Sequence, residues 1–225
     1  MSMLSNLDLI RRVPLFATLT TEQAGFLAGA VVKRRYKRGE NVVEQGKVSD
    51  SLYILLAGRA RVVMADNQGK EVILATLRVG DCIGEMSLID DEPHSASVVA
   101  ELQSDVLILA RDAFSRCLAA NFAINDAIMR SLVQRLRSAG QKIASLALLD
   151  VHARVANLLL DAAVVTDASG ARLTPDKITR QDIAKSVGAS REMVSRVMKS
   201  FEEQGFIHTL DTGALRVVER RSRPR

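Results

Sequence analysis

Glycine divides residues 31–110 of this 225-residue chain into short apolar runs. It stands at Gly39, Gly46, Gly58, Gly69, Gly80 and Gly84. The runs between them, such as SLYILLAG and EVILATL, have the length of strands, and turn signals about 7 to 12 residues apart are typical of an all-β sandwich or small barrel. The clearest hairpin turn is DNQGK at 66–70, because Asn and Gly tolerate the positive φ that tight turns require. We therefore predict a β domain over this block.

After this block the apolar residues follow a helical period. They are spaced alternately by three and four residues, at Met129, Leu132, Leu136, Ala139, Ile143 and Leu146. This heptad seam predicts a long helix that pairs with a second copy of the chain in a parallel homodimer. The alternative is an amphipathic helix packed on its own β domain, since the seam spans only about two and a half heptads. A second line of residues is predicted to serve such packing, at Val133, Gly140, Ala144 and Ala147.

Two short helices around a glycine are predicted further along the chain. They cover TRQDIAKSVG at 179–188 and ASREMVSRVMKSFEEQG at 189–205. Thr179 and Ser190 have side chains that cap helix N-termini, and Gly188 supplies the turn between the helices. Such a pair is a helix-turn-helix.

Turn-forming residues mark the segments on either side of this pair. VTDASGARLTPDK at 165–177 is rich in Gly, Pro, Ser and Asp, which predicts an exposed loop. GFIHTLDTGALRVVE at 205–219 is predicted to form a small β-hairpin, or wing.

The second helix of the pair separates charged from apolar residues. At about 100° per residue, one arc of roughly 140° holds Arg191, Glu192, Ser195, Arg196 and Lys199. The opposite arc, predicted to be buried, holds Met193, Val194, Val197, Met198 and Phe201. In a helix-turn-helix this helix enters the DNA major groove, where Arg can donate two hydrogen bonds to guanine and Glu can accept one from cytosine. A solvated charged face is the alternative, but it explains the caps and the turn glycine less well.

The same segment resembles a known family. ITRQDIAKSVGASREMVSRVMKSFEEQGFI at 178–207 is similar to the DNA-binding motif of the catabolite activator and fumarate-nitrate regulator family of bacterial transcription factors. The resemblance continues in order through VPLFATLT, GDCIGEMSLIDDEPHSASVVA and LALLDVHARVA, the last as a hinge. It implies an α+β chain with a cyclic-nucleotide-binding-type β-roll (jelly roll) at 1–118, a dimerisation helix and hinge at 119–149, and a winged helix-turn-helix at 150–225.

The resemblance also implies roles for individual residues at the DNA. Arg191, Glu192 and Arg196 are the expected base readers, and Arg180 and Ser190 the expected phosphate contacts. Ser195 on the same face completes the predicted DNA-binding set. The implied target is a two-fold symmetric site with TGTGA-like half-sites. RNA polymerase is a further expected partner, because the loop at 165–172 occupies the place of the catabolite activator's polymerase-contacting surface.

The β block contains the stretch in which cyclic-AMP-binding members of the family hold their ligand. The resemblance implies that Gly84, Glu85 and Met86 keep two parts of that site, the backbone N–H groups that meet the phosphate and the carboxylate that takes the ribose hydroxyl. The phosphate-binding Arg of the family is replaced by His94, which the expected Ser95 follows. A His is mostly neutral at pH 7, and losing one charge-assisted hydrogen bond costs about ten- to a hundredfold in affinity.

Small residues stand where the family recognises adenine. The Thr-Ser pair that contacts adenine across the dimer aligns with Ala139 and Gly140, whose side chains form no hydrogen bonds. Cyclic AMP is therefore disfavoured. Space at the dimer axis, and relatives that respond to cyclic di-GMP, make cyclic di-GMP the preferred effector. The alternatives are a cyclic-AMP-responsive regulator and a pocket without a ligand.

Composition bounds the remaining function classes. With 48% hydrophobic and 25% charged residues the chain resembles ordinary soluble domains, and its net charge of +5 mildly favours an anionic partner. Five Arg lie at 216–225, where a frayed tail is a simpler interpretation than a phosphate clamp. No apolar run is long enough for a membrane span and the N-terminus lacks a secretion signal, so we expect a cytoplasmic protein with no membrane partner.

Motifs of catalysis and metal binding are missing from the sequence. Cys82 and Cys117 lack the spacing of a metal site and are expected to be core thiols. The chain contains no GxSxG, HExxH or GxxxxGK pattern, so we expect no enzyme. A pure ligand-binding module is the other class to consider, but modules in which a β-roll regulates a kinase or a channel do not end in a winged helix-turn-helix.

Overall fold

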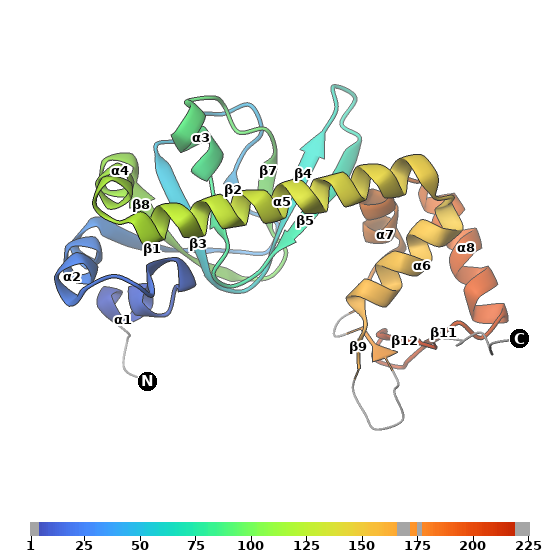
Figure 1. Cartoon of the computed structure of the whole chain (residues 1–225). Helices are drawn as coiled ribbons and strands as arrows, with labels where there is room; N and C mark the ends of the chain where they lie inside the picture. Colours follow the sequence, from blue (N-terminus) through green and yellow to red (C-terminus); the bar gives the residue numbers. More distant parts are fainter. Residues whose placement is uncertain (1–4, 166–171, 175–176, 219–225) are drawn as a thin grey trace, which may run out of the picture. The chain divides into compact units, whose positions relative to one another are not determined.

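The computed structural model describes residues 5–165, 172–174 and 177–218 (Figure 1). The chain divides into two compact units, Met1–Arg137 and Ser138–Arg225. The long helix α5 (Phe122–Leu148) runs through the boundary between them. The long helix expected from the heptad seam is therefore present, whereas the division into 1–118, 119–149 and 150–225 stays a prediction.

Two four-stranded sheets form the centre of the first unit. One has the order β1 (Val31–Tyr36), β8 (Ser104–Ala110), β3 (Ser51–Ala57), β6 (Cys82–Ile83). The other has the order β2 (Asn41–Val43), β7 (Ser97–Ala100), β4 (Ala60–Ala65), β5 (Glu71–Leu77). The β domain predicted for residues 31–110 is confirmed, with one short helix, α3 (Glu85–Asp90), following β6. The predicted turn at 66–70 joins β4 to β5, where the Asp66 N–H donates to the Lys70 carbonyl at 3.0 Å.

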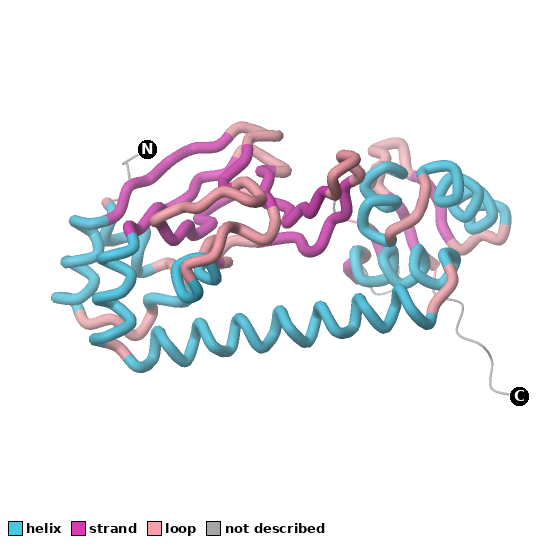
Figure 2. The backbone as a smooth tube through the Cα atoms, turned by 90° about the horizontal axis from the view of Figure 1, so that it is seen from above, coloured by secondary structure: helices cyan, strands magenta, loops and turns pink. Residues whose placement is uncertain are grey.

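Alternation along the central strands explains why both faces of the first sheet are buried. In β3, Leu52 and Ile54 point into one core and Leu55 points into another. The second of these cores lies between the sheets and includes Tyr36 and Val106. The first lies under α1 (Asn6–Arg11), η1 (Pro14–Phe16), α2 (Thr21–Ala30) and α4 (Arg111–Ala120). In two views, α1, α2 and α4 gather at one end of the strands (Figure 1; Figure 2).

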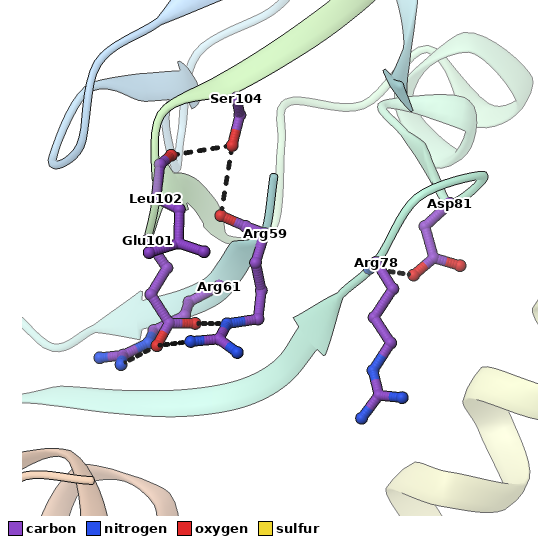
Figure 3. A network of polar contacts seen from close by, with 7 residues as sticks. All are labelled: Arg59, Arg61, Arg78, Asp81, Glu101, Leu102 and Ser104. Atoms are coloured by element: carbon purple, nitrogen blue, oxygen red, sulfur yellow. Dashed lines mark hydrogen bonds and ion pairs between the residues drawn. The ribbon is translucent and has the colours of Figure 1, made fainter. Parts of the chain in front are cut away.

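A polar network fixes the turn that joins β3 to β4 (Figure 3). Glu101 accepts hydrogen bonds from the guanidinium groups of Arg59 and Arg61. The Ser104 hydroxyl donates to the Leu102 carbonyl at 2.9 Å, and it lies so close to Gly58 that a Cβ there would be 2.3 Å from Oγ. Because Gly58 also has a φ of 92°, only glycine can occupy this turn.

Helix α5 packs on the first unit through one face only. Ile124 and Ile128 are buried in its core, and Leu132 is half-buried against the same core. The other five residues of the predicted seam are exposed, at Met129, Leu136, Ala139, Ile143 and Leu146. The second line of residues was wrongly assigned to packing, because Val133, Gly140, Ala144 and Ala147 are exposed as well. The residues that pack on the first unit, Ile124, Ile128 and Leu132, are spaced by four, and of these only Leu132 belongs to a predicted line.

The second unit contains the predicted helix-turn-helix. Its helices are α6 (Val151–Ala162), α7 (Arg180–Val187) and α8 (Arg191–Glu203). Thr179 caps α7 and Ser190 caps α8, each by accepting a hydrogen bond from a backbone N–H three residues on. The predicted wing is confirmed as the antiparallel pair β11 (Ile207–Thr209) and β12 (Leu215–Val217).

Two expectations for the second unit need correction or lie outside the structure. Parts of the predicted loop at 165–177 form strands, since Val165 belongs to β9 (Val164–Val165) and β10 (Arg172–Leu173) pairs with both β9 and β12. The predicted hinge is largely helical and breaks only at Leu149 and Asp150, between α5 and α6. Residues 166–171, which make up most of the expected polymerase-contacting loop, and residues 219–225 of the basic tail lie outside the described residues.

Candidate DNA-binding helix and effector pocket

The exposed face of α8 carries the predicted base readers. Arg191, Glu192 and Arg196 are exposed, and Ser195 is half-buried. The buried face consists of Val194, Val197, Met198 and Phe201. Met193 was expected on that face but is 47% exposed, because it lies at the margin of the apolar arc. The separation of charged and apolar residues is thus real, and it leaves a polar helix surface that the fold itself does not use.

The phosphate contacts implied by the family resemblance lie at two helix N-termini. Arg180 is exposed at the first position of α7. Ser190 is exposed, its Oγ accepts from the Met193 N–H at 3.2 Å, and its hydroxyl also interacts with the Glu192 carboxylate. The pKa of Glu192 is lowered, first by its own backbone N–H and then by Ser190, so this carboxylate is an acceptor at neutral pH.

The angle between α7 and α8 depends on the turn glycine. Gly188 has a φ of 65°, and its N–H donates to the Ala184 carbonyl. This left-handed conformation ends α7 without the steric cost that other residues incur. Arg154 of α6 adds a hydrogen bond of 2.6 Å to the Val187 carbonyl and so holds α6 against the end of α7.

A cavity of about 180 Å³ lies in the first unit beside α3. Five of the seven predicted ligand-binding residues line it, namely Gly84, Glu85, Met86, His94 and Ser95. The other two, Ala139 and Gly140, are exposed positions of α5 and are not part of the described lining. Arg135, also from α5, lines the cavity and was missed by the sequence analysis.

Two serines hold the His94 ring. Its Nε2 is 2.8 Å from the Ser49 hydroxyl and its Nδ1 is 2.9 Å from the Ser87 hydroxyl. Burial lowers the pKa of His94, so the ring is neutral at pH 7. A neutral imidazole can donate from one nitrogen and accept at the other, and a hydroxyl can take either part. His94 is therefore a satisfied polar residue of the pocket wall, and it supplies no positive charge for a phosphate.

The cationic group of the pocket is Arg135. Its Nη1 lies 2.6 Å from Glu85 Oε1, and its Nη2 donates to the Cys82 carbonyl at 2.5 Å. The second carboxylate oxygen, Oε2, is buried and has no hydrogen-bond partner among the described residues. Burial raises the pKa of Glu85, and the Arg135 guanidinium offsets part of that rise. The sequence signal for Arg135 is its place three residues after Leu132 on the packing line of α5.

Comparison with known proteins shows which family the chain is similar to. The protein-family model of the cyclic nucleotide-binding domain matches residues 33–121, and the family model of the Crp-like helix-turn-helix domain matches residues 153–222. The chain is 35% identical over 184 residues to the cAMP-activated global transcriptional regulator Vfr of Pseudomonas aeruginosa, covering 78% of this chain and 85% of Vfr. The chain belongs to the CRP/FNR family. It is therefore a DNA-binding transcription regulator with a cyclic nucleotide-binding domain.

Further relatives of this CRP/FNR regulator differ in the effector that their names give. The cAMP-activated global transcriptional regulator CRP of Salmonella typhimurium is 35% identical over 178 residues, covering 77% of this chain and 83% of CRP. Among solved structures, the cyclic di-GMP-responsive regulator CLP of Xanthomonas campestris superposes with a TM-score of 0.73. That match covers 88% of this chain and 97% of CLP at 24% identity, and it shows the fold alone.

The two cysteines of this CRP/FNR regulator lie in the core of its first unit. Cys82 and Cys117 are buried, and burial raises the pKa of Cys82 to about 12, as expected for core thiols. Across residues 5–165, 172–174 and 177–218 no three His, Cys, Asp or Glu side chains gather as metal ligands. In the same ranges no helix combines the length and the apolar character needed to cross a membrane.

Removing Arg135 tests its role as the partner of Glu85. Arg135→Met should lower the free energy of unfolding by about 2–3 kcal/mol near pH 7.5, because it leaves the Glu85 carboxylate buried without a partner. The Glu85 pKa is raised in the folded state and rises further without the guanidinium, so the variant should regain stability as the pH falls and the carboxyl takes a proton. Urea unfolding at about pH 7.5 and pH 5.5 measures both effects.

Two companion variants make this result specific. Adding Glu85→Gln to Arg135→Met should recover at least about half of the loss, since no charge is then left buried. Arg130→Met removes an exposed pair with Asp126 on the same helix and should cost less than about 0.5 kcal/mol. An Arg135→Met protein as stable as the parent at both pH values would contradict the assignment.

Proposed function

We propose that this regulator is a cytoplasmic homodimer that binds a two-fold symmetric DNA site with TGTGA-like half-sites, under control of a nucleotide bound beside α3. The observation that carries the proposal is the exposed face of α8. Arg191, Glu192 and Arg196 project from a helix that is capped at its start and buried on its opposite side. A helix so held can enter a major groove without losing any contact with its own core.

The exposed stripe of α5 supports the dimer. Large apolar residues recur every seven positions, at Phe122, Met129, Leu136 and Ile143, and each is at least half exposed. Phe122 extends the predicted seam by one heptad toward the N-terminus. Four such side chains along one helix face form the pattern that pairs two helices in a coiled coil. A two-fold dimer would present two copies of α8 to half-sites about 34 Å apart.

Residue chemistry around the pocket supports cyclic di-GMP over cyclic AMP as the effector. His94 is neutral and already bonded on both sides, so it cannot replace the phosphate-binding Arg that the family resemblance implies. Ala139 and Gly140 offer no group for adenine. The cavity of about 180 Å³ is smaller than the roughly 300–1,000 Å³ of typical ligand pockets, so the preference rests on these residues and not on the size of the cavity. RNA polymerase remains the predicted partner of the loop at 165–172.

Base reading by α8 can be separated from charge alone by two substitutions on the same face. Arg196→Ala should weaken binding to a TGTGA palindrome about ten- to a hundredfold while changing binding to a scrambled duplex little, because a base contact is lost. Lys199→Ala should weaken binding to both duplexes alike and reduce the salt dependence. Mobility shifts at several salt concentrations measure both, and a parent protein without any preference for the palindrome would contradict the proposal.

The effector is tested by calorimetric titration with cyclic di-GMP and cyclic AMP. We expect the parent protein to bind cyclic di-GMP and to bind cyclic AMP weakly. His94→Arg should strengthen cyclic AMP binding by about tenfold or more, since it restores a charge-assisted phosphate contact. His208→Arg adds the same charge at an exposed position of the wing and should leave the affinity for both nucleotides unchanged. Tight binding of cyclic AMP by the parent protein would overturn the preference for cyclic di-GMP. Binding of neither nucleotide would favour a regulator without a ligand.

A further inference from the structure

Arg111, the first residue of α4, joins that helix to the end of α3. Its Nη1 and Nη2 lie 3.3 Å from the carbonyl oxygens of Leu88 and Ser87, in the last turns of α3. Nη1 also lies 2.6 Å from Asp91 Oδ1, and Nε lies 3.0 Å from Asp50 Oδ1. One guanidinium thus contacts both the end of α3 and the residue that precedes β3.

The geometry of α3 explains why it needs such a contact. The helix has six residues, and the residue that follows it, Asp91, is held at a φ of 60°. A helix this short is not stable by itself, and its last carbonyls lack partners within the helix. Arg111 supplies donors to two of them. The Asp50 and Asp91 side chains are about 80% exposed, so their ion pairs add little stability and the carbonyl contacts matter more for position.

Both serines that hold His94 are connected to Arg111. Ser87 accepts from Arg111 through its carbonyl and contacts His94 Nδ1 through its hydroxyl. Ser49 contacts His94 Nε2 and precedes Asp50, which Arg111 holds twice, by the ion pair and by a backbone hydrogen bond of 2.8 Å from the Arg111 N–H to the Asp50 carbonyl. Among the described residues Arg111 is not part of the cavity lining.

We propose that Arg111 is a positioning residue of the effector pocket. It keeps Ser49 and Ser87 on opposite sides of the His94 ring, and it keeps α3 where Glu85 faces the cavity. The role rests on the proposed function, in that the effector is taken to bind beside α3. Arg111 also begins the helix that leads directly into α5, so the same side chain links the pocket wall to the segment that carries the exposed stripe.

The test compares Arg111→Gln with Arg35→Gln. Arg35 forms a similar two-point pair with Asp105 in the same unit, so its loss controls for a broken ion pair. Because the chain contains only three His, the ring-nitrogen NMR signals of His94 can be resolved and assigned without any ligand present. In the parent and in Arg35→Gln we expect the signals of one fixed tautomer. In Arg111→Gln we expect averaged tautomer signals and amide exchange in α3 that is at least about tenfold faster.

Nucleotide binding is measured on the same proteins. The affinity for cyclic di-GMP or cyclic AMP, whichever the parent binds, should fall at least about tenfold in Arg111→Gln and stay unchanged in Arg35→Gln. Arg111→Lys is a second variant for the case in which Arg111→Gln does not fold. It keeps the charge but loses the forked donor, so we expect it to change the His94 signals and the amide exchange of α3 in the same direction.

The two proposals fail differently. A parent protein that binds neither nucleotide, with His94 and α3 still responding to Arg111→Gln, would remove the effector and leave the positioning role in place. Folded Arg111→Gln and Arg111→Lys proteins with parental His94 signals and parental α3 exchange would overturn the positioning role, whatever the parent binds.

Discussion

Helix α5 has two different faces, one buried in its own chain and one exposed and apolar, and the other features of the molecule depend on this difference. One face is buried in the first unit through Ile124 and Ile128, while the other leaves Leu136 74% exposed and Ile143 67% exposed. Large apolar side chains along a helix are unfavourable in water unless another surface covers them. We propose that a second copy of the same helix covers them. A symmetric target site and a paired presentation of α8 both follow from that single association.

The pocket and this helix share residues. Glu85, which the family resemblance assigns to a ribose hydroxyl, is already held by Arg135 of α5, and its second oxygen is left without a partner among the described residues. A nucleotide hydroxyl that donates to Glu85 Oε2 would therefore contact the same carboxylate that Arg135 of α5 contacts through Oε1. Arg111 adds a second connection from α3, through the start of α4. These contacts give an effector a physical route to α5, and they involve ionic and hydrogen-bonding groups rather than apolar packing.

Local signals predicted much of the fold, and long-range contacts account for what was missed. Glycine spacing, the turn at 66–70 and the helix caps at Thr179 and Ser190 each depend on neighbouring residues, so the sheets and the helix-turn-helix were predicted. The pairing of β10 with β12 joins residues more than forty positions apart, and two-residue strands leave no period to detect. The contacts of Arg135 with Glu85 and of Ser49 with His94 likewise span 50 and 45 residues. The spacing of Ile124, Ile128 and Leu132, which was not recognised as the packing line, is the signal that could have indicated Arg135.

Sedimentation equilibrium of the parent protein and of a Leu136→Glu, Ile143→Glu variant tests the central claim most directly. The account predicts that the parent sediments at micromolar concentration as a dimer of the 24.5 kDa chain, and that two buried carboxylates per helix make the folded variant a monomer. A parent that remains monomeric throughout that concentration range, or a variant that dimerises as tightly as the parent, would contradict it.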